Sequence, residues 1–180
     1  MLSIQLFAWK DPGMAERPLC DFAIRSAGPA DVPVILSLIR DLAEYERLSH
    51  EVEATEDVLR RNLFGERPYA EALIGQLREE PVAFAVYFHN FSTFLGRPGL
   101  YLEDLYVKPA ARGLGIGRAI LRRLASIAVE RDCGRLEWSV LDWNTPAREF
   151  YKSLGAIPMT DWTIHRVTGD ALRSLALSPS

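Results

Sequence analysis

The stretch Arg112-Gly113-Leu114-Gly115-Ile116-Gly117-Arg118 decides the fold, and it lies between a strand-like run over residues 100–107 and a helix-like run over residues 116–131. Glycines that alternate at the start of a helix allow a tight backbone turn and a close approach of a ligand. The first amide N–H groups of a helix have no intrahelical partner, so they can converge on one anion. The stretch therefore predicts a phosphate-binding loop.

The charges around this loop support an anion site. No carboxylate occurs between Asp104 and Glu130, although acidic residues are usually favourable in the first turn of a helix. The same interval contains a group of basic residues, namely Lys108, Arg112, Arg118, Arg122 and Arg123. Because the whole chain has a formal net charge of −3, this local positive excess points to an external anion. The alternative interpretation is a glycine-containing loop followed by a solvated basic helix face.

Two common phosphate motifs do not fit this loop. A Walker loop requires Gly-Lys-Ser/Thr, which does not follow here. A dinucleotide fingerprint requires a small residue three positions after its second glycine, and Ile120 stands at that place after Gly117. The spacing Arg-x-x-Gly-x-Gly instead resembles the coenzyme A cradle of the GNAT superfamily of acyl-CoA N-acyltransferases. The resemblance implies acetyl-CoA as cosubstrate, with its pyrophosphate held by Arg112, Gly113, Leu114, Gly115, Ile116, Gly117 and Arg118.

Length and composition favour one ordinary globular domain. The 180 residues are 48% hydrophobic, which is enough for one well-buried core, so we expect a single domain over residues 21–180 after a loosely held extension over residues 1–20. A charged fraction of 25% without long like-charge runs predicts no nucleic-acid partner. No apolar run reaches the ~20 residues needed to span a bilayer, so no membrane partner is expected. Scattered histidines, with Cys20 and Cys133 far apart, predict no metal site and a reducing, cytoplasmic location.

Hydrophobic periodicity predicts a mixed α/β fold. The expected strands cover residues 22–25, 71–77, 82–91, 100–107, 136–141 and 162–167. The expected helices cover residues 33–47, 55–64, 116–131 and 146–152. The order β-α-α-β-β-β-α-β-α-β, with a crossover helix before the strand near residue 138, matches the GNAT fold, in which helices flank a mixed, mostly antiparallel central sheet.

Two adjacent carboxylates, Glu103 and Asp104, interrupt the predicted strand over residues 100–107. Adjacent side chains on a strand face opposite sides, so one of them would point at a packed face unless the strand bulges or opens there. One interpretation is an edge strand with solvated acids, and the other is a carboxylate held beside a cleft. In the GNAT interpretation, backbone N–H groups of the opened strand would hold the pantetheine and polarise the thioester oxygen, at Leu105, Tyr106 and Val107.

A second run, Asn-x-x-Ala-x-x-Phe-Tyr-x-x-x-Gly-Ala, covers residues 144–156 and resembles the other GNAT signature. Asn144 can cap a helix that Pro146 opens, and this capping role explains the asparagine without any ligand. The resemblance implies in addition that Asn144 and Ala147 contact the coenzyme and that Tyr151 points at the thioester sulfur.

Four further places resemble one branch of the superfamily, the diamine acetyltransferases of the spermidine/spermine and thialysine type. They are Leu42-Ala43-Glu44-Tyr45-Glu46, Leu102-Glu103-Asp104, Asp142-Trp143-Asn144 and Trp162. The resemblance implies an amine pocket formed by Tyr45, Glu46, Glu103, Asp104, Asp142 and Trp143. Asp142 departs from the branch, whose members carry Glu at this position. Family analogy also favours a homodimer.

These residues suit transfer of an acetyl group from a thioester to a primary amine by direct attack. An alkylammonium titrates near ~10 and must first lose a proton, which Glu103 can attract and accept through water. The departing thiolate, with a pKa near ~8.5, can take a proton from the Tyr151 phenol. We therefore expect an acetyl-CoA-dependent N-acetyltransferase that acts on a small cationic di- or polyamine or a lysine-like amine.

Two alternatives remain at this level. The same fold could acetylate a protein amine or an amino-acid-like molecule. It could also be a CoA-binding module without turnover, although such a module would need neither Glu103 nor Tyr151. Thiol release from acetyl-CoA with a panel of amines discriminates among the three.

Overall fold

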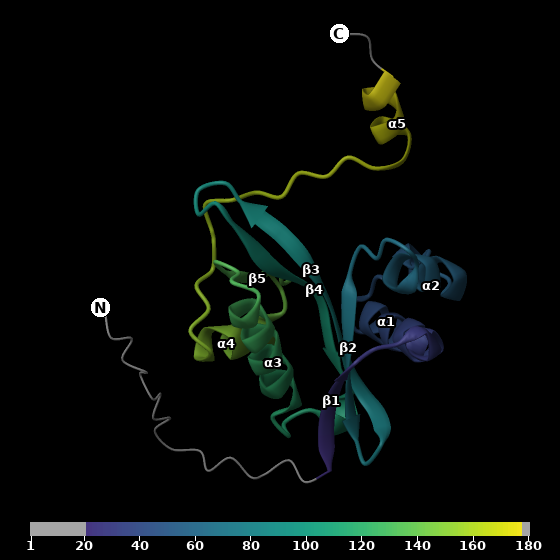
Figure 1. Cartoon of the computed structure of the whole chain (residues 1–180), viewed down its shortest axis with the longest axis vertical. Coiled ribbons are helices and arrows are strands. Elements are labelled where there is room, and N and C mark those ends of the chain that lie inside the picture. The colour runs from purple at the N-terminus through teal and green to yellow at the C-terminus, as the bar shows by residue number, and fades with distance from the viewer. Residues whose placement is uncertain (1–20, 178–180) are drawn as a thin grey trace. The chain divides into compact units, whose positions relative to one another are not determined.

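The computed structural model of the chain describes residues 21–177, so the predicted extension over residues 1–20 lies outside the described residues. The chain divides into two compact units, one ending at Ser139 and the other beginning at Val140 (Figure 1). A single domain over residues 21–180 stays a prediction. Each unit is described below by itself.

The first unit contains a five-stranded sheet whose strands lie in the order of the chain. Its strands are β1 (Phe22–Ser26), β2 (Glu71–Leu77), β3 (Glu80–Ser92), β4 (Arg97–Val107) and β5 (Leu136–Trp138). The first four pair antiparallel, whereas β5 pairs parallel to β4. A parallel pair needs a long crossover, and a helix supplies it here. The predicted mixed, mostly antiparallel sheet is confirmed.

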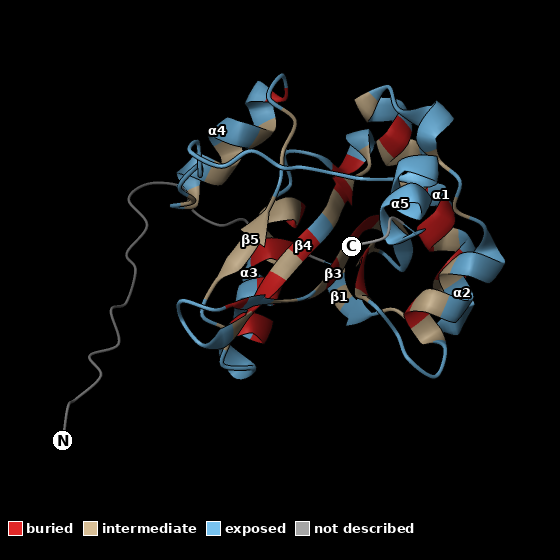
Figure 2. Cartoon of the chain, turned by 90° about the horizontal axis from the view of Figure 1, so that it is seen from above, coloured by how far each residue is buried: buried red, intermediate tan, exposed pale blue. Residues whose placement is uncertain are grey.

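Helices cover both faces of this sheet. They are α1 (Val32–Glu46), α2 (Glu56–Phe64) and α3 (Ile116–Glu130). Figure 1 and Figure 2 show α1 and α2 on one face and α3 on the other. Thr55 caps α2, because its side chain accepts a hydrogen bond from the Val58 backbone N–H. The bounds of α1, α2 and α3 agree with the predicted helices within a few residues.

The core of the first unit forms where the helices pack on the sheet. On the α1 side, Ile35 and Leu38 pack with Phe84 of β3 and Tyr106 of β4. On the other side, α3 buries the apolar residues that recur at helical spacing, namely Ile116, Ile120, Leu121, Leu124, Ile127 and Ala128. This apolar face of α3 is buried.

A β-bulge in β4 reverses the direction of its side chains. Tyr87 of β3 pairs with Leu102, but its neighbour Val86 pairs with Asp104, so Glu103 is the extra residue. Val86 packs against the α1-side core, and adjacent residues of β3 face opposite sides. Leu102 therefore faces α3, whereas Asp104 faces α1, although they are only two positions apart in the sequence. The bulge confirms that the strand opens at its two adjacent acids.

An ion pair joins the end of α3 to the sheet. The Arg131 guanidinium binds both carboxylate oxygens of Glu71 on β2, and the Tyr87 hydroxyl donates to Glu71 at 3.2 Å. Arg131 holds the pKa of Glu71 below its usual range, while burial and Glu71 raise the pKa of Tyr87 to about 12. The ion pair fixes the end of α3, and the buried side chains fix the helix against the sheet. α3 therefore supports the glycine loop at its start.

The second unit contains α4 (Thr145–Ser153) and α5 (Gly169–Leu177). The predicted strand over residues 162–167 is wrong, because this segment belongs to no ladder and Trp162 and Ile164 are more than two-thirds exposed. Apolar alternation makes a strand only when a neighbouring strand completes its hydrogen bonds. The predicted strand over residues 136–141 is also too long, since pairing ends at Trp138. The sequence interpretation missed α5.

Candidate active site

The glycine loop before α3 has the geometry of an anion cradle. Gly113 and Gly115 adopt φ of 75° and 85°, in the left-handed region that favours glycine. Gly115 caps α3 without any side-chain hydrogen bond, and the first turn contains no acidic residue. A Cβ added at either glycine would meet no described atom within 4 Å, so the space beside the backbone is open. These features fit a pyrophosphate bound by the backbone N–H groups at the start of α3.

The strand that leads into the cradle has one unpaired edge. Pairing between β4 and β5 ends at Leu102 and Trp138, but β4 continues to Val107. Within the described part of the chain, residues 103–107 pair with β3 only. Their other edge can therefore supply hydrogen bonds to an extended ligand such as pantetheine, as predicted for Leu105, Tyr106 and Val107.

Three carboxylates gather beside this strand. Glu46 lies in the last turn of α1, and Glu103 and Asp104 lie at the bulge of β4. Burial raises the pKa of Asp104 to about 6, with added repulsion from Glu103 and Glu46. Burial also raises the pKa of Glu46. None of the three forms an ion pair with another described residue, so together they favour a cation.

The charge of Asp104 should make stability depend on pH. Its folded pKa of about 6 exceeds the unfolded value near ~3.9, so the folded state binds the proton more tightly and stability falls as pH rises through this window. We expect Asp104→Asn to raise the free energy of unfolding by about 2 kcal/mol above pH 7 and to change little below pH 4. Denaturant titrations at pH 3.5 and 7.5 measure this difference. Glu103→Gln is the control, because Glu103 is exposed and should show a smaller gain; equal effects of Asp104→Asn at the two pH values would contradict the assignment.

Tyr45 and Arg112 are in direct contact. The Arg112 guanidinium carbon lies 4.5 Å from the centroid of the Tyr45 ring and 5.6 Å from that of Tyr106. Its Nε donates a hydrogen bond of 2.9 Å to the Val107 carbonyl. The sequence motif predicts a phosphate contact for Arg112, but no pattern in the sequence indicated this contact with α1.

The remaining predicted residues belong to the second unit. Asn144 is buried and accepts a hydrogen bond of 3.3 Å from the Ala147 N–H at the start of α4, as the capping interpretation predicts. Tyr151 is half-buried in the same helix, and its ring centroid lies 5.4 Å from that of Phe150. Two further predicted residues, Asp142 and Trp143, are exposed just before the helix. The helix α4, its cap and the two residues before the cap therefore carry five of the predicted positions: Asp142, Trp143, Asn144, Ala147 and Tyr151.

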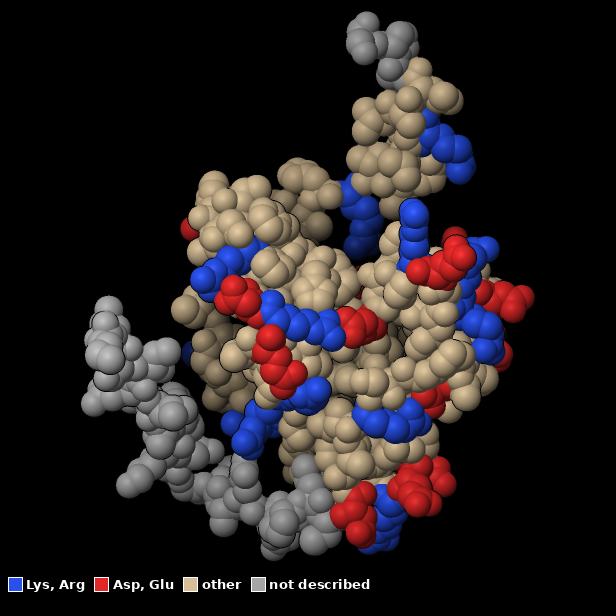
Figure 3. Space-filling view, in the orientation of Figure 1, with Lys and Arg blue, Asp and Glu red and all other residues tan. Residues whose placement is uncertain are grey.

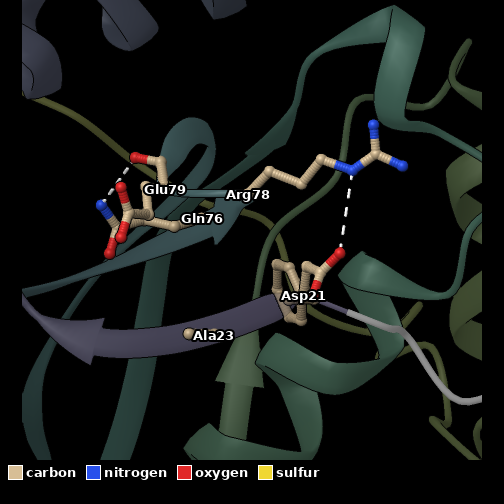
Figure 4. Close-up of a pocket in the computed structure, with 6 residues that line it drawn as sticks. Asp21, Ala23, Gln76, Arg78 and Glu79 are labelled. Atoms are coloured by element: carbon tan, nitrogen blue, oxygen red, sulfur yellow. Dashed lines mark hydrogen bonds and ion pairs between the residues drawn. The ribbon is translucent and has the colours of Figure 1, made fainter.

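A hollow of about 540 Å³ lies elsewhere in the first unit (Figure 4). It is bounded by the start of β1 and the turn between β2 and β3, with Arg78 and Asp21 forming an ion pair of 3.8 Å. None of the predicted site residues lines it. It has no convergent set of catalytic groups, so we do not assign it a catalytic role.

Three general observations concern surface charge, metal-binding groups and membrane-spanning helices. Figure 3 shows basic and acidic side chains interspersed on the face in view. Among residues 21–177, no cluster of His, Cys, Asp and Glu is arranged to hold a metal ion. In the same range, no helix is both long and apolar enough to cross a membrane.

Comparison with known proteins identifies the family of this chain. The acetyltransferase (GNAT) family model matches residues 35–156. Thialysine N-epsilon-acetyltransferase of Bos taurus is 42% identical over 164 residues, which cover 85% of this chain and 96% of that protein. L-ornithine N5-acetyltransferase of Arabidopsis thaliana is 31% identical over 197 residues, and the match covers 84% of this chain and 86% of that protein. The solved structure of an integron cassette protein from V. cholerae has a TM-score of 0.75 and 28% identity, and the match covers 88% of this chain and 99% of that one.

The chain therefore belongs to the acetyltransferase (GNAT) family. Within that family it is an N-acetyltransferase close to the diamine branch, since a human spermidine/spermine N(1)-acetyltransferase-like protein is also 34% identical over 174 residues, covering 91% of this chain and 25% of that protein.

Proposed function

We propose that the protein transfers the acetyl group of acetyl-CoA to a primary amine of a small diamine, polyamine or lysine-like substrate. The observation that carries this proposal is the unpaired acidic cluster of Glu46, Glu103 and Asp104 beside the open edge of β4. A cationic acceptor would supply the charge that these three groups lack. The names of relatives that act on thialysine and ornithine, which are amino acids with a second amino group, support the same class of acceptor.

The cradle residues would hold the cosubstrate by its pyrophosphate. Gly113, Gly115 and the first N–H groups of α3 would supply the donors, and Arg118 in the first turn would add positive charge. The unpaired N–H groups of β4 would hold the pantetheine and polarise the thioester carbonyl. Asn144 and Ala147 of the second unit are proposed as further coenzyme contacts, on the family resemblance.

The carboxylates would prepare the amine. Glu103, exposed at the bulge, would attract the ammonium and accept its proton through water. Asp104 and Glu46 would bind the charges of the acceptor. Tyr45, Asp142 and Trp143 are proposed as further acceptor contacts, on the family resemblance. The neutral nitrogen would then attack the thioester carbon, so that a C–N bond forms and the C–S bond breaks. The Tyr151 phenol would give its proton to the departing sulfur, and the acylated nitrogen would release its extra proton to water, from which the phenol would be protonated again.

The cluster predicts selectivity for acceptors with more than one charge. Each exposed ion pair contributes ~0.2–1 kcal/mol, so three pairs would favour a diamine over its monoamine analogue by roughly 3- to 100-fold in kcat/KM. The preference should shrink as salt rises, because screening shortens to ~3 Å at 1 M. The measurement is kcat/KM for both amines in wild type, Glu103→Gln and Asp142→Asn. Equal values for the two amines in wild type would reject the cationic pocket and favour a protein or amino-acid-like acceptor.

We also propose a cytoplasmic homodimer. Cys133 is a free thiol, which suits a reducing compartment. Several large apolar side chains are strongly exposed in one copy, among them Phe94, Ile157 and Trp162. A second copy would cover such residues, and light scattering of the purified protein measures the oligomeric state directly.

A further inference from the structure

We propose that Arg112 is a positioning residue for the acceptor site, an inference that rests on the proposed function. Its place in the Arg-x-x-Gly-x-Gly loop predicts a contact with phosphate. Its side chain instead lies over the Tyr45 ring at 4.5 Å and over the Tyr106 ring at 5.6 Å, and its Nε donates to the Val107 carbonyl at 2.9 Å.

Three elements meet at this one side chain. Tyr45 lies in the last turn of α1, Tyr106 and Val107 end β4, and Arg112 begins the loop that leads into α3. A guanidinium over an aromatic face is attracted by the ring, and the hydrogen bond to Val107 fixes its orientation. Arg112 therefore holds the end of α1 against β4. Because Glu46 follows Tyr45 directly, the same contact sets where Glu46 stands relative to Asp104.

The charge of Arg112 also acts on a neighbouring side chain of the protein, the Tyr106 phenol. Burial is the main cause that raises the pKa of Tyr106. Asp41 and Glu44 of α1 raise it further, and Arg112 lowers it, so all three side chains act on the same phenol. Arg118 differs, because its side chain forms no hydrogen bond or ion pair with another described residue and lies in the first turn of α3. The two arginines of one motif therefore have separate roles, Arg118 toward the phosphate and Arg112 toward the acceptor side.

The first test separates these roles by two measured constants, the acetyl-CoA Kd and the acceptor KM. We expect Arg112→Gln to raise the acceptor KM about tenfold at saturating acetyl-CoA, because the ring contact and the hydrogen bond are both lost, and to change the acetyl-CoA Kd by less than about twofold. The matched variant Arg118→Gln should show the reverse pattern. Calorimetry gives the Kd, and initial rates with a diamine give the KM. An Arg112→Gln variant with weakened acetyl-CoA binding and an unchanged acceptor KM would overturn the proposal.

A double-mutant cycle tests the contact itself. In a Tyr45→Phe background the ring remains, so Arg112→Gln should still raise the acceptor KM about tenfold. In a Tyr45→Leu background the ring is gone, so the part of the Arg112→Gln effect that comes from the contact with Tyr45 should disappear, and the remaining effect should be smaller. Arg112→Lys keeps the charge without the planar fork and should lie between wild type and Arg112→Gln. Equal effects of Arg112→Gln in the two backgrounds would overturn the proposal.

The wild type distinguishes failure of this inference from failure of the proposed function. If wild type binds acetyl-CoA but acetylates no amine of the panel, the proposed function is rejected. The same cycle is then followed by the unfolding temperature, which should drop with Arg112→Gln in the Tyr45→Phe background and much less in the Tyr45→Leu background. Additive drops would show that Arg112 does not hold α1.

Discussion

Tyr151→Phe is expected to lower kcat about 10²–10⁴-fold with little change in acetyl-CoA affinity. The substitution removes the phenolic proton and keeps the ring, so the contact with Phe150 at 5.4 Å should persist. The Tyr151 carbonyl, which accepts hydrogen bonds from the Leu154 and Ala156 N–H groups at the end of α4, is unaffected. A large fall in kcat would therefore report the lost acid and not a disturbed helix.

Single-turnover and steady-state rates with a diamine measure this loss. The limb of the pH profile that reports the acid should disappear in Tyr151→Phe, since the substitution removes the ionisable phenol. Tyr69→Phe is the matched control, because Tyr69 is 78% exposed and lies just before β2, outside the predicted site. A Tyr151→Phe enzyme with most of its turnover would assign proton donation to water or to another side chain.

Gly115→Val should raise the acetyl-CoA Kd at least about 100-fold. Gly115 has φ of 85°, where a β-branched residue is strongly disfavoured, and the added methyl groups would occupy the space in which the pyrophosphate approaches the backbone. Losing several charge-assisted hydrogen bonds of ~1.5–3 kcal/mol each accounts for the expected size. The affinity would be measured by calorimetry.

A second glycine separates backbone strain from lost binding. Gly96, in the turn between β3 and β4, also has a positive φ of 62°, and a Cβ there would meet no described atom within 4 Å. Gly96→Val should therefore lower the unfolding temperature to a similar degree and leave the acetyl-CoA Kd near its wild-type value. If Gly115→Val bound acetyl-CoA as tightly as wild type, with the fold intact by circular dichroism, the cradle assignment would fail.

The sequence predicted most of the first unit because its signals are local. Helical spacing in α3 and the Thr55 cap of α2 depend on neighbours three or four residues away. The strand that became β2 was predicted over the residues it occupies, because turn residues on both sides limit its length. Local patterns of this kind also carried the recognition of the glycine loop.

The three differences from the sequence prediction depend on contacts that no local pattern contains. Trp162 and Ile164 alternate as in a strand, but the strand needs a partner that the pattern cannot supply. The adjacent acids Glu103 and Asp104 left open a solvated edge strand and a carboxylate held beside a cleft. Only the pairing register shows that the strand bulges and that Asp104 faces α1. Pairing of Arg112 with Tyr45 joins residues 67 positions apart, so a motif of seven residues could not indicate it.

The unpaired edge of β4 also bears on aggregation. A free strand edge is a template for another chain, and proteins limit this hazard with short edges and charges. Here the free edge covers only residues 103–107, and two of the five are carboxylates. An intruding strand would have to remove the exposed Glu103 carboxylate from water without neutralising it, at a cost of several kcal/mol. The groups proposed to select a cationic amine would thus also protect the enzyme from edge-to-edge assembly while its cosubstrate is absent.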